Sequence, residues 1–163
     1  GYGDMEINHI AVPQFLLNNE AGYVNFTNFK ADMLQISSTS GDITISSSSI
    51  PDISVVSSSG YISLKQTEYL DCSLTAKSGE INIADAVSHG NLSLQTGSGD
   101  ISVTYQNEPD SLTFDMASGS EDLSLKFSSA NYQIETSAHK QGVIGNGEYR
   151  LTLNSDHGTI VIK

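Results

Sequence analysis

A glycine that returns every 19 or 20 residues is the feature that most constrains how this chain folds. Successive glycines are spaced 19, 19, 19, 20 and 20 residues apart, and one more follows after 39 residues: Gly22, Gly41, Gly60, Gly79, Gly99, Gly119 and Gly158. A fixed period of this length is typical of repeat architectures, in which each copy forms one structural unit. The 39-residue interval corresponds to two periods, with the boundary between them near His139.

Apolar residues flank each glycine at constant offsets. Around Gly41, for example, Leu34 and Ile36 precede the glycine by seven and five residues, and Ile43 and Ile45 follow it. Apolar residues two positions apart, with polar residues between them, predict half-buried strands. Glycine between two such strands permits the positive φ that a tight corner requires. Each period is therefore expected to form a strand, a glycine corner, a second strand and a looser return loop.

Two periods depart from this pattern. In the sixth, the second apolar pair is displaced by two positions to Leu123 and Leu125, which indicates a short insertion at residues 120–122. In the period near His139, the offsets fall on Tyr132 and Ile134, but no glycine marks the corner.

The repeat predicts an all-β fold, a parallel β-solenoid of about eight coils with 19–20 residues per coil. A two-strand unit cannot bury its apolar face alone, so neighbouring coils must stack to build a continuous core. At a strand spacing of ~4.8 Å, such a stack is roughly 35–40 Å long. Parallel stacking places one isoleucine from each of four coils in a single buried column: Ile43, Ile62, Ile81 and Ile101. An antiparallel β-sandwich is the alternative, but it rarely needs the same residue class at the same offset.

Length and charge narrow the range of functions. The 163 residues suit one domain, residues 1–163, with a cap over about residues 1–14. A net charge of −12 repels nucleic acid and anionic lipid surfaces, so neither is expected as a partner. No apolar run reaches the length of a membrane span.

The repeated Ser-Gly-Asp-Ile core resembles a bacterial adhesin repeat domain of unknown function. The best copies are "LQISSTSGDITI" (34–45) and "LSLQTGSGDISV" (92–103), and the final residues 145–163 resemble the end of such domains. The resemblance implies an extracytoplasmic β-solenoid, secreted or at the cell surface, and offers no catalytic residues to transfer. Tyr61 and Thr159 depart from the motif, which has Asp at these positions.

Acidic residues follow several of the corner glycines directly, at Asp42, Glu80 and Asp100. In stacked coils they would form a column of carboxylates, and Ca²⁺ prefers several oxygen ligands. Aspartate after glycine also serves turns by accepting backbone N–H groups, and Tyr61 interrupts the column. The turn role is favoured, which leaves the three acids as weak calcium candidates.

The other reactive side chains have structural interpretations. His139 and His157 fall near the same corner of adjacent predicted coils, but no cysteine or carboxylate accompanies them at the spacing of zinc ligands. Cys72 occupies the offset held by Leu34 and Leu92, so it is expected in the core. The tyrosines are a possible sugar-stacking platform, although they are scattered: Tyr61, Tyr69, Tyr105, Tyr132 and Tyr149.

These observations favour a non-enzymatic, adhesion-like binding module, with a glycan or a protein as its ligand. No convergent group of His, Cys, Lys and carboxylate is left unexplained by the repeat, so neither catalysis nor a cofactor is expected. A spacer or sensor domain of a larger envelope protein is the alternative. A polysaccharide-active enzyme is less favoured, because a glycosidase needs two facing carboxylates and the seven Lys and Arg residues are widely scattered.

Overall fold

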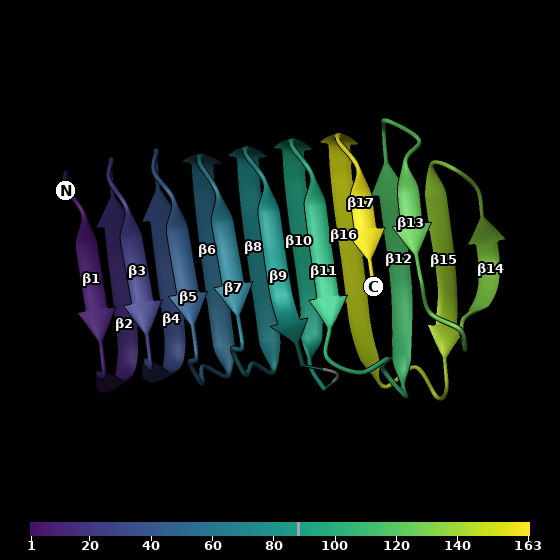
Figure 1. The fold of residues 1–163 in the computed structure, drawn as a ribbon, viewed down its shortest axis with the longest axis horizontal. Helices are drawn as coiled ribbons and strands as arrows, with labels where there is room; N and C mark the ends of the chain where they lie inside the picture. The colour runs from purple at the N-terminus through teal and green to yellow at the C-terminus, as the bar shows by residue number, and fades with distance from the viewer. Residues whose placement is uncertain (88) are drawn as a thin grey trace.

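The computed structural model describes residues 1–87 and 89–163, and Figure 1 shows two β-sheets facing each other along one rod. No helix occurs in this part of the chain, so none has the length and apolarity of a membrane span. The nine-stranded sheet contains β2 (Ala11–Asn19), β4 (Lys30–Ser38), β6 (Asp52–Ser59), β8 (Asp71–Ser78), β10 (Asn91–Ser98), β12 (Leu112–Ser118), β14 (Asn131–Glu135), β15 (His139–Ile144) and β16 (Tyr149–His157). The eight-stranded sheet contains β1 (Met5–Asn8), β3 (Val24–Thr27), β5 (Ile43–Ser46), β7 (Ile62–Lys65), β9 (Ile81–Ala86), β11 (Ile101–Tyr105), β13 (Leu123–Leu125) and β17 (Ile160–Ile162).

The predicted parallel β-solenoid is confirmed. Ile43 pairs in register with Ile62, Ile62 with Ile81, and Ile81 with Ile101, all on parallel strands. The four side chains are buried between the sheets. Alternation along each strand turns the intervening Ser, Thr and Asn residues outward, so one apolar core runs the length of the rod.

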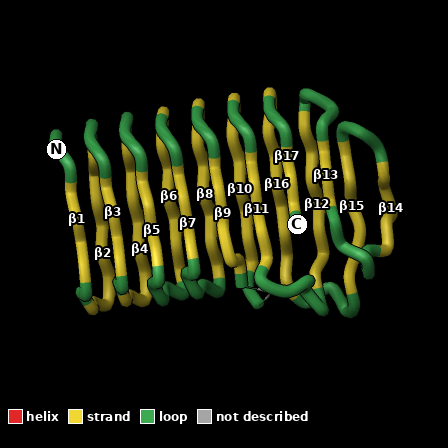
Figure 2. The backbone as a smooth tube through the Cα atoms, viewed as in Figure 1, coloured by secondary structure: helices red, strands yellow, loops and turns green. Residues whose placement is uncertain are grey.

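The order of the coils differs from the expected eight consecutive ones. Five coils, from β2–β3 to β10–β11, stack in chain order (Figure 2). The C-terminal coil β16–β17 then lies between β10–β11 and β12–β13. Leu151 of β16 consequently pairs with Leu92 on one side and with Phe114 on the other.

The sixth period is displaced along its whole length. Leu123 and Leu125 pair with Ile160 and Ile162, as their displaced position predicts. On the other sheet, however, Phe114, and not Leu112, pairs with Leu151, so both strands of this coil are shifted by two residues. The predicted insertion at residues 120–122 is therefore wrong, and the extra residues lie before β12.

The expected coil near His139 is instead an antiparallel hairpin. β14 pairs antiparallel with β15, which pairs antiparallel with β12. The chain reverses between Thr136 and His139, where the Thr136 hydroxyl oxygen accepts the His139 N–H at 2.9 Å. Gly142 permits the close approach of the Phe114 ring and of the Asn131 carbonyl. Since this segment lacks a corner glycine, it closes the C-terminal end of the rod as a hairpin.

Two columns of strained corners run along the rod. At the first, Gly22, Gly41, Gly60, Gly79 and Gly99 have positive φ, and a Cβ at each would meet the glycine of the preceding coil. At the second, polar residues exactly 19 apart have φ between 49° and 58°: His9, Asn28, Ser47, Gln66 and Asp85. The second column contains no glycine, which explains why the glycine period did not identify it.

Cys72 lies in the core, between Ile53 of β6 and Leu92 of β10. Its side chain is buried, and burial raises the pKa of the thiol. We expect Cys72→Ser to lower the free energy of unfolding by about 1–3 kcal/mol, because a hydroxyl then replaces the buried thiol among apolar side chains. Urea denaturation followed by circular dichroism measures the loss. Fast reaction of the native thiol with a bulky reagent would contradict the burial.

Candidate functional site

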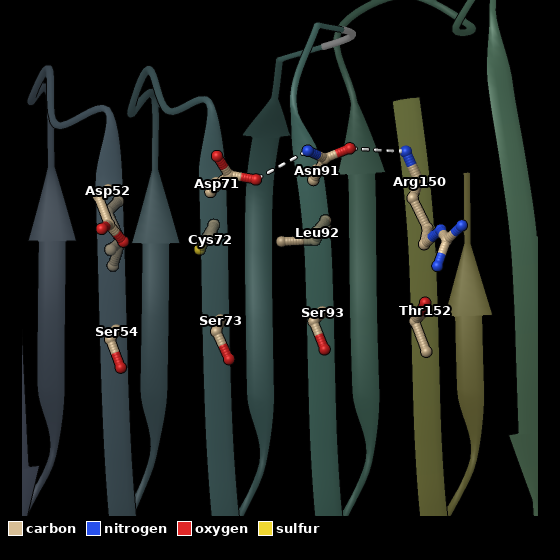
Figure 3. A pocket seen from close by; sticks show the side chains of 11 residues that line it. Asp52, Ser54, Asp71, Cys72, Ser73, Asn91, Leu92, Ser93, Arg150 and Thr152 are labelled. Carbon is tan, nitrogen blue, oxygen red and sulfur yellow. Dashed lines mark hydrogen bonds between the residues drawn. The ribbon is translucent and has the colours of Figure 1, made fainter. Parts of the chain in front are cut away.

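A groove bordered by polar side chains lies on the outer face of the nine-stranded sheet. It runs over β6, β8, β10 and β16, and its outward side chains form two rows: Asp52, Asp71, Asn91 and Arg150, and below them Ser54, Ser73, Ser93 and Thr152 (Figure 3). We call this surface the outer groove. Each of the four coils contributes one residue to each row, so the groove runs parallel to the axis of the rod.

Strand register places these residues side by side. Asp52 pairs with Asp71, and Asp71 with Asn91, at the start of three parallel strands. The next residue of each strand points inward, as the buried Ile53 and Leu92 show. Because successive side chains alternate between faces, burial of these apolar residues fixes the polar row on the outer face.

Asn91 links the middle of the row. Its amide nitrogen Nδ2 donates to Oδ1 of Asp71 at 2.7 Å, and its amide oxygen accepts the backbone N–H of Arg150 at 3.0 Å (Figure 3). The side chain of Asn91 is therefore held in place from both sides. This contact also joins the chain-order coils to the inserted C-terminal coil.

The charges of the outer groove are unpaired within the described residues. The ion pairs of the described residues join His139 to Asp115 and Lys140 to Glu135, and neither pair includes a residue of the outer groove. Two carboxylates at one end and a guanidinium at the other thus face solvent. The row of Ser and Thr side chains beside them supplies hydroxyl groups that both donate and accept hydrogen bonds.

The acidic residues named from the sequence lie elsewhere, at the glycine corners. Oδ1 of Asp42 accepts the backbone N–H of Tyr61 at 2.9 Å, and Oδ1 of Asp100 accepts that of Thr159 at 2.8 Å. Glu80 and Asp100 stand in adjacent coils, whereas Tyr61 separates Asp42 from Glu80. In residues 1–87 and 89–163, no three His, Cys, Asp or Glu side chains are grouped to hold a metal ion.

The expected proximity of the two histidines is wrong. His139 lies on β15 and His157 on β16, and β12 separates these strands. Nε2 of His139 instead contacts Oδ1 of Asp115 at 2.9 Å. The insertion of β16 on the far side of β12 is what moves the two apart.

The tyrosines do not gather on one surface. Tyr69 is buried in the core, Tyr105 packs edge-on against Phe127, and Tyr132 packs edge-on against Phe114. Burial raises the pKa of both Tyr69 and Tyr105. These rings are thus part of the packing, and they form no shared platform for stacking on sugars.

The outer groove was missed from the sequence, although a signal for it exists. Its upper row stands eight residues before the glycines of four coils, and its lower row six residues before them. These offsets lie between the apolar positions, where polar residues are expected on any exposed strand. Only the register of the stacked strands shows that a charged row adjoins a row of hydroxyl groups.

The stacked parallel coils, the corner columns and the polar outer face define a β-solenoid repeat protein. Within this class, the family model described as Toastrack DUF4097 matches residues 1–163. The chain belongs to this family of unknown function. No curated protein and no solved structure matches the chain. The adhesin role that the sequence resemblance implies stays a prediction.

Proposed function

We propose that this protein is a non-enzymatic binding module of the cell surface or of the extracytoplasmic space, and that it holds a glycan in the outer groove. The unpaired Asp52, Asp71 and Arg150 beside Asn91 are the observation that carries this proposal. Carboxylates accept hydrogen bonds from sugar hydroxyls, and a guanidinium donates them. A chain laid along the rod meets one residue of each row at each of the four coils, from two carboxylates at one end to a guanidinium at the other.

The character of the groove favours a glycan over a protein ligand. Protein interfaces depend on buried apolar or aromatic anchors. The exposed large apolar side chains lie outside the groove: Tyr2, Ile10, Leu16, Tyr23, Val56 and Leu70. The small hydroxyl side chains of Ser54, Ser73 and Ser93 leave room for a flat polar ligand close to the sheet.

The absence of catalysis is part of the proposal. Hydrolysis of a glycosidic bond requires carboxylates on both sides of the bond. Asp52 and Asp71 stand on neighbouring parallel strands and project from the same face.

Titration calorimetry with a panel of neutral and acidic bacterial and host polysaccharides, with and without Ca²⁺, tests the proposal. We expect binding by the wild-type protein without release of reducing ends. We expect Asp71→Ala and Arg150→Ala each to weaken it roughly 10- to 100-fold, since a hydrogen bond to a charged group is lost.

Asp156→Ala is the matched control, because Asp156 is an exposed carboxylate at the other end of β16. This variant is expected to bind like the wild type. No binding to any polysaccharide would favour the spacer function instead. Turnover that disappears on replacing Asp52, Asp71, Asp42, Glu80 or Asp100 would show that the protein is an enzyme.

A further inference from the structure

The outer face of the eight-stranded sheet carries its two signs of charge at opposite edges. The acidic row lies at one edge, where each member directly precedes a strand: Asp4, Asp42, Glu80, Asp100 and Asp122. The lysine row lies at the other edge, where three coils each have an exposed lysine at the end of a strand: Lys65, Lys126 and Lys163. These are three of the seven Lys and Arg residues of the chain, so this edge concentrates its positive charge.

Strand register aligns each row along the rod. Lys65 pairs with Ser46 on one side and with Ala84 on the other, and each of these stands four residues after the acidic edge. Asp42 is held at its edge because its Oδ1 accepts the backbone N–H of Tyr61 at 2.9 Å. Neither ion pair in the part of the chain that the structure describes includes a member of the two rows.

A strip of small, uncharged side chains separates the two rows. One residue per strand contributes to it, from β3 to β13, and we call this strip the middle row: Asn25, Thr44, Ser63, Asn82, Ser102, Val161 and Ser124. These side chains are half-buried, and their strands lie side by side along the rod (Figure 1). Small side chains of this kind allow another sheet to approach closely.

Two copies of this face complement each other in one orientation. A two-fold axis parallel to the rod, between two facing copies, keeps each coil at its level and exchanges the two edges of the sheet. The acidic row of each copy then faces the lysine row of the other. A two-fold axis parallel to the strands instead sets the acidic rows against each other, and such juxtaposition of like charges is costly.

We propose that two copies of this chain associate through the outer faces of their eight-stranded sheets, about a two-fold axis parallel to the rod. Lys65 then lies between the second copy's Asp42 and Glu80, because β7 lies between β5 and β9. Lys126 faces the second copy's Asp122, since both flank β13. Each of these contacts occurs twice in the dimer.

The charge pattern and the area of the face both favour a second copy as the partner. Another protein would need rows of both signs at the same separation, whereas a second copy supplies them by symmetry. Seven strands ~4.8 Å apart, with five residues of ~3.4 Å in each, give roughly 600 Å² per copy. The pair would bury about 1,200 Å², the lower limit for a specific interface. Packed sheets cross at roughly 30°, so the rods diverge toward β1, where Glu6 continues the middle row.

Sedimentation velocity of the 163-residue chain over a range of concentrations measures the association. We expect a reversible monomer–dimer equilibrium. Lys65→Glu places a carboxylate between two acidic residues at two equivalent sites, and it should raise the dissociation constant about tenfold or more. Lys77→Glu is the matched control, because Lys77 is an exposed lysine of the nine-stranded sheet, in β8. This variant is expected to dimerise like the wild type.

A mixture of two charge-reversal variants separates loss of contact from loss of folding. Glu80→Lys alone should also weaken the dimer, since it sets two ammonium groups side by side. An equimolar mixture of Lys65→Glu and Glu80→Lys should form a dimer with one chain of each kind. In this mixed dimer the two new charges face each other at one site, and the original Lys65 and Glu80 do so at the other.

Cross-linking tests the direction of the two-fold axis. The axis passes along the middle row, so each of its residues meets its own counterpart. Facing sheets lie ~10 Å apart, beyond the reach of a disulfide but within that of a short bismaleimide. Ser63→Cys and Ser124→Cys should each cross-link to themselves, whereas the wild type, whose Cys72 is buried, should not cross-link.

Three results would overturn the proposal. They are a purely monomeric chain, a dimer unaffected by Lys65→Glu, and preferential cross-linking of Ser63→Cys to Ser124→Cys, which an axis parallel to the strands would give. The outer groove lies on the other sheet and remains open in both copies. Glycan binding plays no part in these measurements, so their outcome is independent of the proposed function.

Discussion

Gly41→Ala is expected to lower the free energy of unfolding by about 3 kcal/mol or more. Gly41 has φ of 108°, which L-residues rarely adopt, and its new Cβ would meet the carbonyl oxygen of Gly22 in the preceding coil. Strain in such a conformation costs about 1–3 kcal/mol, and displacement of a neighbouring backbone adds to it. Urea denaturation of both proteins at one concentration, followed by circular dichroism, measures the difference.

Gly3→Ala is the matched control for the collision. Gly3 has a similar φ of 119°, but nothing lies within 4 Å of a Cβ placed there. The control retains the conformational strain and lacks the contact with another coil. Equal losses in the two variants would mean that close stacking of the corners contributes nothing.

Leu151→Ala is expected to cost about 2–5 kcal/mol, the range for a leucine removed from a packed core. Leu151 is completely buried in β16, between Leu92 of β10 and Phe114 of β12. The cavity thus opens where the C-terminal coil joins the two parts of the rod. Thermal and urea unfolding measure the loss.

Leu70→Ala is the control, because the Leu70 side chain is 60% exposed. We expect a change below about 0.5 kcal/mol in this variant. If Leu151→Ala were as mild as the control, the burial of Leu151 in β16 would be wrong.

The repeat predicted the regular part of the fold because one constraint acts there in every coil. From Gly22 to Gly99, the burial of apolar pairs and the need for positive φ at the corner fall on the same offsets. Sequence and structure therefore agree on the isoleucine column and on the position of Cys72. Beyond Gly99, the sequence retains strand-like alternation, but this pattern does not indicate which strands pair with one another.

The placement of β16 and the outer groove depends on such long-range pairing. Leu151 fits beside Leu92 as well as a residue of the sixth period does, and no local pattern distinguishes the two arrangements. Arg150 reaches Asn91 only because β16 is inserted next to β10. The acids that follow the glycines were visible in the sequence, and the structure shows two of them capping backbone N–H groups.

The inserted coil bears on how the protein reaches its folded state during synthesis. A ribosome releases the chain from its N-terminus, so the strands up to β11 can stack in the order in which they emerge. β12 and β13 emerge next, but their neighbours in the finished rod are β16 and β17, which are made later. Residues 112–144 therefore cannot reach their final pairing with the rod until residues 149–162 have left the ribosome. We therefore expect a final folding step later than the stacking of the first coils, with these strands exposed until it occurs.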